Sequence, residues 1–134
     1  MSNEYQIRKQ DFTPAQLGLS AQVLSAERTS TTMDCSAANQ LTVMVDLTTW
    51  AAATTVSVQV DIRDEGDAQW FPLQAASIAA GVATMTDLIW RKTVTAADQW
   101  EMDTPINANQ FRIRITSAGG TTDTASVYAR LAAL

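Results

Sequence analysis

Histidine is absent from the sequence, and cysteine occurs once, at Cys35. Without histidine the chain lacks the commonest general base, the commonest metal ligand and every serine-histidine or cysteine-histidine nucleophile pair. A single cysteine cannot form an internal disulfide, and Cys35 follows an acid, Asp34, so nothing beside it in the sequence lowers the pKa of its thiol. We therefore expect Cys35 to be a small buried or half-buried strand residue, and we expect no enzyme activity.

Charged residues are also few, at 17% of the chain against about 25% in a typical globular domain. The formal net charge is -5 and the basic residues are scattered, so the basic stripe that binds nucleic-acid phosphates is missing. The sequence has neither the roughly 18 consecutive apolar residues of a membrane span nor an apolar signal segment near Met1. We expect no nucleic-acid or membrane partner, and synthesis in a reducing cytoplasm.

Sequence motifs for phosphate and calcium binding are lacking as well. Gly119-Gly120 is followed by threonines and no lysine, which favours a turn between strands over a phosphate-binding loop. The acidic segment 61–67 does not have EF-hand spacing, and a solvated hairpin tip is its simpler interpretation. We predict no catalytic residue, no metal site and no cofactor. A glycosidase that uses two carboxylates stays open as a third hypothesis, because it needs no histidine.

Alternation of apolar and polar residues predicts an all-β chain. The alternation is clearest over 41–48 and 56–63, and the glycine turn at 64–67 predicts a hairpin to the apolar residues that follow it. Further strands are predicted at 28–35, 82–90, 92–102, 111–116 and 125–131. About eight short strands are the number expected of a two-sheet sandwich or a jelly roll, and we predict an antiparallel β-sandwich of jelly-roll type.

The first residues lack this alternation, so we expect an irregular N-terminal arm over 1–21 and the β-sandwich domain over 22–134. Within the arm, Thr13-Pro14-Ala15-Gln16 is typical of a helix start and predicts a short helix over 14–19. An arm beside a compact domain suits a subunit that clasps a neighbour. The side chains expected to contact another subunit are Tyr5, Ile7, Phe12, Leu17 and Leu19.

Four tryptophans lie near predicted strand ends, at Trp50, Trp70, Trp90 and Trp100. A large amphipathic ring at such a position can cap the core or enter a subunit interface, and we favour that interpretation. The alternative is an exposed platform for sugar rings, for which Trp50 and Trp90 are the candidates.

The order of elements over 40–134 resembles that of small virion proteins of tailed bacteriophages. The resemblance is carried by two alternating strands at 41–47 and 56–62, a charged glycine turn before Trp70, and a last hairpin formed by 111–116 and 126–131. It rests on patterning and turn chemistry. Proteins of this kind include capsid decoration, or cement, proteins, which commonly have a jelly-roll fold and brace neighbouring capsid subunits.

The resemblance implies a structural function and supplies no active-site residues. We expect a virion protein, made in the host cytoplasm, that sits on the outer capsid surface and bridges major capsid protein subunits. A homo-oligomer is expected, with a trimer favoured and a dimer possible. The alternative is a carbohydrate-binding or adaptor β-sandwich of a phage tail, neck or head fibre.

Overall fold

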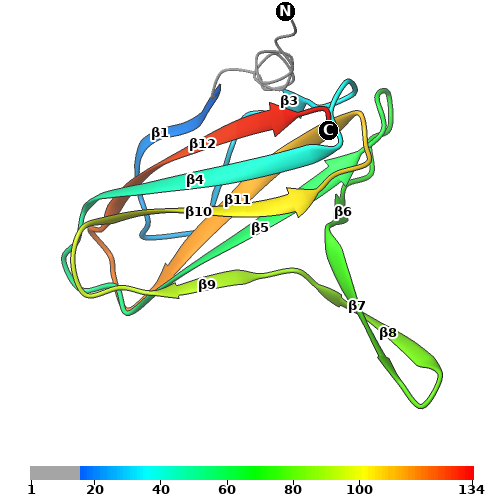
Figure 1. Cartoon of the computed structure of the whole chain (residues 1–134). Coiled ribbons are helices and arrows are strands. Elements are labelled where there is room, and N and C mark those ends of the chain that lie inside the picture. The colour runs from blue at the N-terminus through cyan, green and yellow to red at the C-terminus, as the bar shows by residue number, and fades with distance from the viewer. Residues whose placement is uncertain (1–15) are drawn as a thin grey trace, which may run out of the picture.

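The computed structural model describes residues 16–134, and these form strands without a helix (Figure 1). The expected all-β class is confirmed, and every strand pair is antiparallel. The described residues contain twelve strands where about eight were expected, and three of the twelve are only two residues long. The strands are β1 Gln16–Val23, β2 Arg28–Thr29, β3 Met33–Asp34, β4 Gln40–Thr49, β5 Thr55–Arg63, β6 Phe71–Pro72, β7 Gln74–Ala79, β8 Val82–Asp87, β9 Trp90–Thr93, β10 Asp98–Pro105, β11 Gln110–Ala118 and β12 Thr124–Ala132.

Two antiparallel sheets pack face to face, as in a β-sandwich (Figure 1). The four-stranded sheet has the order β1-β12-β4-β10. The six-stranded sheet has the order β2-β11-β5-β6, with β3 also on β11 and β9 also on β5. The pairing is nested, because β1 pairs with β12, β2 and β3 with β11, β4 with β10, and β5 with β9. The chain therefore folds back on itself, and strands of its first part pair in reverse order with strands of its last part.

The core lies between the two sheets and comes from the apolar positions of the alternating strands. Burial of each such aliphatic side chain contributes about 1.5–3 kcal/mol. The predicted inward faces of β4, β5, β11 and β12 are confirmed, except that Ile62 at the end of β5 is only half buried. The buried set includes Leu41, Val43, Val45, Leu47, Val56, Val58, Val60, Phe111, Ile113, Ile115, Ala125, Val127, Ala129 and Leu131.

The glycine turns behave as predicted. Gly66, at φ 82°, lies in the turn after β5, and the chain returns so that Ile62 pairs with Phe71. Gly119, at φ 83°, lies in the connection between β11 and β12. Both positions need a residue that tolerates a left-handed backbone, which glycine does without a steric cost.

The N-terminal boundary differs from the prediction. The helix expected over 14–19 is wrong in its described part, because Gln16 to Leu19 lie in β1 and pair with β12. Residues 16–21 thus belong to the four-stranded sheet and not to an arm. Two register shifts interrupt this pairing, and Ala21 adopts φ 45°, so the strand lacks a simple alternation of buried and exposed positions. The rest of the expected arm lies outside the described residues.

The middle of the chain also differs from the prediction. The strands expected at 82–90 and 92–102 are divided differently, into β8, β9 and β10. Strand β7 was not predicted, and with β8 it forms a separate two-stranded sheet. Figure 1 shows this hairpin projecting away from the two packed sheets. Its two-residue turn has positive φ at Ala80 and Gly81, as hairpin turns that match strand twist require.

Asp123 fixes the loop between β4 and β5 to the start of β12. Its fully buried carboxylate accepts hydrogen bonds from the backbone N–H groups of Ala51, Ala52 and Ala53 at 3.0, 3.3 and 3.2 Å. Burial alone would raise the pKa of this carboxyl, but the backbone donors together lower it. A Cβ at Gly120 would lie 2.2 Å from Asp123 Oδ1, so only glycine leaves room for the carboxylate.

Candidate functional site

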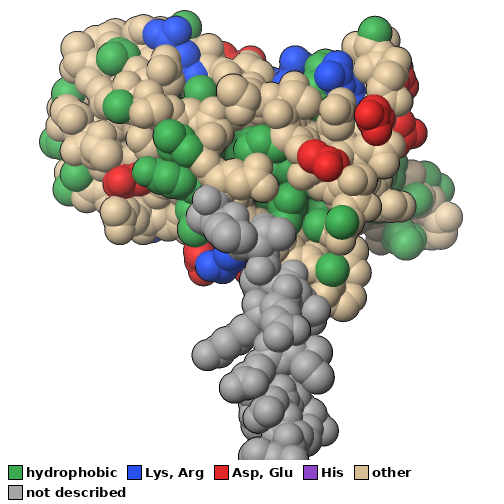
Figure 2. All heavy atoms as spheres, turned by 90° about the horizontal axis from the view of Figure 1, so that it is seen from above, with side chains coloured by type: hydrophobic (Ala, Val, Ile, Leu, Met, Phe, Trp, Pro, Cys, Tyr) green, Lys and Arg blue, Asp and Glu red, His purple; other side chains and the backbone are tan. Residues whose placement is uncertain are grey.

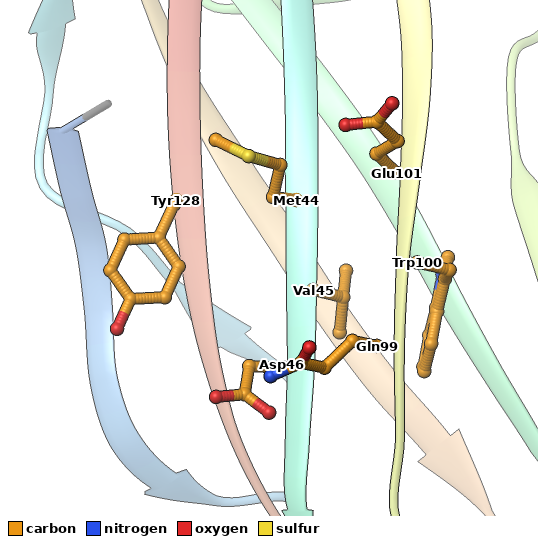
Figure 3. A pocket seen from close by; sticks show the side chains of 7 residues that line it. All are labelled: Met44, Val45, Asp46, Gln99, Trp100, Glu101 and Tyr128. Carbon is orange, nitrogen blue, oxygen red and sulfur yellow. The ribbon is translucent and has the colours of Figure 1, made fainter. Parts of the chain in front are cut away.

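The outer face of the four-stranded sheet carries an open hollow of about 490 Å³. Figure 3 shows its side chains on the neighbouring strands β12, β4 and β10. The register explains the arrangement, since Met44 on β4 lies opposite both Tyr128 on β12 and Glu101 on β10. The lining residues are Met44, Val45, Asp46, Gln99, Trp100, Glu101 and Tyr128. An aromatic ring, a thioether and carboxylates thus share one face, a mixture suited to holding another molecule.

Trp100 lies at the edge of this hollow. It is opposite Val45 on the inward side of β10, the edge strand, and it packs partly against the core. Lys92 on β9 lies with its Nζ 5.7 Å from the Trp100 ring centroid and 3.3 Å from Asp98 Oδ2. The Gln99 N–H, and after it Lys92, lowers the pKa of the Asp98 carboxyl. Because β9 and β10 belong to different sheets, Lys92 links the two sheet edges.

The outer face of the six-stranded sheet carries a charge cluster around Asp61. Arg114 donates from Nε to Asp61 Oδ2 at 2.8 Å and from Nη2 to Oδ1 at 2.9 Å. Arg112 Nε donates to the same Oδ2 at 2.8 Å. The Asp61 side chain is only 5% exposed. Both of its oxygens are occupied, so Asp61 is a structural anchor and is not free to act on a substrate.

Trp70 extends this cluster toward the turn after β5. The guanidinium carbons of Arg63 and Arg112 lie 4.2 and 4.6 Å from the Trp70 ring centroid, within the range of cation–π attraction. Arg63 Nε also donates to Gln110 Oε1 at 2.9 Å. Trp70 is therefore committed to the arginines of its own chain. Sequence analysis did not predict this cluster. The signal that could have indicated it is the pair Arg112 and Arg114, which lie on the same face of one strand.

The acidic segment 61–67 is divided by the structure. Asp61 is buried, which corrects its expected place in a solvated tip, whereas Asp64, Glu65 and Asp67 are exposed there as expected. In residues 16–134 no three cysteine or acidic side chains gather closely enough to hold a metal ion. The segment thus forms a turn and an internal ion cluster.

Cys35 is buried directly after β3. Its Sγ lies 3.3 Å from the Ala108 carbonyl oxygen, to which the thiol donates. Burial, and then the negative charge of Asp34, raises the pKa of the Cys35 thiol to about 11. The expectation of a buried side chain is confirmed, although Cys35 lies just after β3 and not within a strand. The raised pKa leaves hardly any thiolate at neutral pH, which favours low reactivity.

The predicted contact residues fall into three groups. Tyr5, Ile7 and Phe12 lie outside the described residues. Leu17 is 50% exposed and lies opposite Tyr128, beside the hollow on the four-stranded sheet. Leu19 packs partly against the core, opposite Val127. Of the two described residues, only Leu17 is exposed enough to contact a neighbour.

The two tryptophans predicted as an aromatic contact surface have different surroundings. Trp50, after β4, is 38% exposed, and its indole N–H donates to the Ala53 carbonyl oxygen at 2.8 Å. Trp90 begins β9 opposite Val58 and packs partly against the core. Trp50 therefore offers part of its ring at the surface, while Trp90 mainly covers the core.

The hairpin of β7 and β8 is the most exposed apolar element described. Every residue of both strands is exposed. Four of the eight large hydrophobic side chains exposed in the described residues lie on or next to it. These four are Phe71 at 54%, Ile78 at 76%, Val82 at 64% and Met85 at 54%. Sequence reasoning missed the hairpin as an element, although residues 74–86 contain no charged residue.

Charged side chains are sparse elsewhere as well. Figure 2 shows them scattered over one face between hydrophobic and uncharged polar groups.

The described residues include no helix that is long and apolar enough to cross a membrane. No protein-family model matches the chain, and no curated protein sequence is similar enough to count as a relative. The two sheet faces and the projecting hairpin are therefore interpreted from their own chemistry.

Proposed function

We propose that the β-sandwich is a jelly roll with an insertion. If β2 and β3 count as one interrupted strand and β6 to β8 are left out, eight strands remain. One sheet then has the order first, eighth, third, sixth, and the other the order second, seventh, fourth, fifth. A long antiparallel ribbon with nested pairs, rolled into two sheets, has this order. The hairpin of β7 and β8 is inserted in the connection between the innermost pair, β5 and β9.

We further propose that the protein decorates and stabilises a bacteriophage capsid by bridging subunits of the major capsid protein. The proposal begins from the resemblance of 40–134 to small virion proteins, and the strand order supports it. The observation that carries it is the packed two-sheet body from which an exposed hairpin, uncharged over 74–86, projects. A bridging protein needs a stiff spacer with an element that reaches past its own surface.

The mechanism is stabilisation by mass action. A protein that binds the assembled shell but not its dissociated subunits shifts the equilibrium toward the shell. Because a capsid repeats the same site many times, weak contacts add up when the decorating protein is itself oligomeric. The low charge of the surface keeps the desolvation cost of each contact small. No bond is made or broken in this function.

The test is to locate the protein and to remove it. Mass spectrometry of purified phage particles should find the chain at a fixed ratio to the major capsid protein. Capsids from a phage that lacks the gene should open at a lower temperature, and added purified protein should restore the original opening temperature. Absence of the chain from purified particles would contradict the proposal. Restoration by a heat-denatured sample of the same protein would also contradict it.

A carbohydrate-binding module of a tail, neck or head fibre is the second candidate. It is favoured by the hollow where Trp100 and Tyr128 flank Asp46 and Glu101, since aromatic rings with nearby carboxylates are the groups that hold sugars. Binding on a glycan array that Trp100→Ala abolishes would support this function. Trp70→Ala is the matched control, because Trp70 lies outside the hollow, against two arginines of the six-stranded sheet.

A further inference from the structure

The hairpin of β7 and β8 gains little stabilisation from the rest of its own chain, because every residue of both strands is exposed. Among the described strands, β7 and β8 pair only with each other. A two-stranded hairpin alone in water is at best marginally stable, because it buries too little apolar surface to offset its loss of conformational entropy. Ala80, in the turn, adds a left-handed backbone at φ 52°, which disfavours the hairpin further. A partner that covered its apolar side chains would stabilise the hairpin.

The register divides the hairpin into two unequal faces. Ala76 lies opposite Met85, and Ile78 lies opposite Ala83, so these four side chains share one face. That face is entirely apolar as far as the Gln74–Asp87 hydrogen bond of 3.0 Å at its base. The other face mixes Ala75, Ser77, Ala79, Val82, Thr84 and Thr86. We call the set Ala76, Ile78, Ala83 and Met85 the apolar hairpin face.

We propose that the apolar hairpin face packs against the same face of a second copy of this chain. A face without charge is complementary to itself, since bringing two copies together creates no like-charge contact and buries apolar groups on both sides. The tip also carries no charge, because 74–86 contains no acidic or basic residue. A surface built for a charged partner would carry the opposite charges, and this one carries none.

The placement of charged residues and proline along the strand edges also favours a second copy of the chain as the partner. Strand β10, one of the two edges of the four-stranded sheet, carries Asp98, Glu101 and Asp103 and ends at Pro105, residues that discourage pairing with another chain, whereas β1, the other edge, has no charged residue or proline. The two edges of the hairpin lack such residues up to Asp87. The chain thus protects the β10 edge and leaves the hairpin, like β1, open to association.

A second copy is also the partner that is present whenever the chain is made. A hairpin reserved for another protein would expose Ile78 and Met85 until that protein appeared, and exposed apolar strands aggregate. Packing against a second copy covers them as soon as two chains have folded. Phe71, 54% exposed in β6 just before β7, is available to extend the contact beyond the hairpin itself. The extension is needed because a stable interface covers about 800 Å² on each partner.

The experiment measures the molar mass of the purified full chain by light scattering during size-exclusion chromatography. We expect the wild type to have about twice the chain mass of 14.5 kDa, because two identical faces that pack on each other form a closed dimer. The double variant Ile78→Thr/Met85→Thr should lose this association and elute as a single chain. Val82→Thr, on the other face, is the matched control and should keep the wild-type mass. Threonine suits strands, so these changes leave the hairpin able to form.

A second measurement tests the contact directly. Ala76→Cys places a thiol on the apolar hairpin face, and Ser77→Cys places one on the other face, while Cys35 stays buried. A short bismaleimide should link two copies through position 76 and leave position 77 largely unlinked. A wild-type protein of single-chain mass would overturn the proposal. So would association that survives Ile78→Thr/Met85→Thr, or equal linking at positions 76 and 77.

This contact would form the homo-oligomer that the proposed function includes, and in that respect the inference rests on the proposed function. Its test, however, needs no capsid. If the chain associates through the hairpin but is absent from phage particles, the capsid proposal fails and this inference stands. If the wild type is a single chain that still occupies capsids, the inference fails and the capsid proposal stands, with the hairpin then covered by the shell.

Discussion

Arg114 donates two parallel hydrogen bonds to Asp61, which lies 53 positions away in the sequence. Burial alone would lower the pKa of the Arg114 guanidinium, but Asp61 and, more weakly, Glu27 raise it. Glu27 Oε2 lies 3.5 Å from Arg114 Nη1. The pair is held by the antiparallel register of β5 and β11, which also brings Arg112 to the same carboxylate. One buried acid thus organises the outer face of the six-stranded sheet.

Asp61→Ala should destabilise the protein by about 3 kcal/mol, because it leaves two arginines beside a buried position without their acceptor. Urea unfolding followed by tryptophan fluorescence measures this change. Asp64→Ala is the matched control, since Asp64 is exposed in the adjacent turn and should change stability by less than about 0.5 kcal/mol. Equal effects of the two substitutions would show that the arginine cluster adds nothing to stability.

Asp123 should make the protein sensitive to acid. The folded-state pKa of Asp123 lies below its ordinary value of 3.8, so its contribution is complete above that value and is lost as pH falls through the folded-state pKa. We expect the free energy of unfolding to fall steeply below about pH 4. Thermal melting over a series of pH values measures the slope.

Asp123→Asn should lower stability at neutral pH by about 1–3 kcal/mol, because its amide group cannot accept from all three backbone donors. The same variant should show a shallower loss of stability in acid. Asp64→Asn serves as the control for removing one negative charge. An acid slope unchanged by Asp123→Asn would assign the sensitivity to other carboxylates.

Cys35 should resist thiol reagents in the folded protein. A rise in pKa from 9.0 to about 11 lowers the thiolate fraction near pH 8 about 100-fold, and burial slows access further. Labelling with a maleimide, with and without urea, measures the ratio of rates. We expect at least that ratio between unfolded and folded protein. Rapid labelling of the folded chain would mean that the segment around Cys35 opens readily.

Removal of residues 1–15 should leave the domain folded, because the first described strand begins at Gln16 and pairs with β12. The melting temperature of the shortened chain should stay within a few degrees of the full chain. If the expected contacts of Tyr5, Ile7 and Phe12 operate, the shortened chain should occupy capsids poorly. Removal of 1–20 is the contrasting variant, and it should melt lower because it deletes most of β1. Equal capsid occupancy by the full and 1–15-deleted chains would remove the arm from the proposed function.

Much of the fold was predictable because alternation reports burial on a strand regardless of its partner. Leu41, Val43 and Val45 face the core whichever strand lies beside β4. The hairpin was harder to predict because Ala, Ser and Thr contrast weakly in hydrophobicity, so β7 and β8 show little alternation. Strand β1 was missed because its register shifts break the period of two.

The sequence by itself determined the inward faces of the main strands, the glycine turns and the lack of histidine chemistry. Tertiary structure alone decided what happens to outward side chains. Asp61 follows the same alternation as Gln59, yet it is buried because β11 brings Arg112 and Arg114 over it. The physical reason is that an outward residue is covered by its neighbours on adjacent strands, and those neighbours depend on strand order and register, which link residues far apart in the chain.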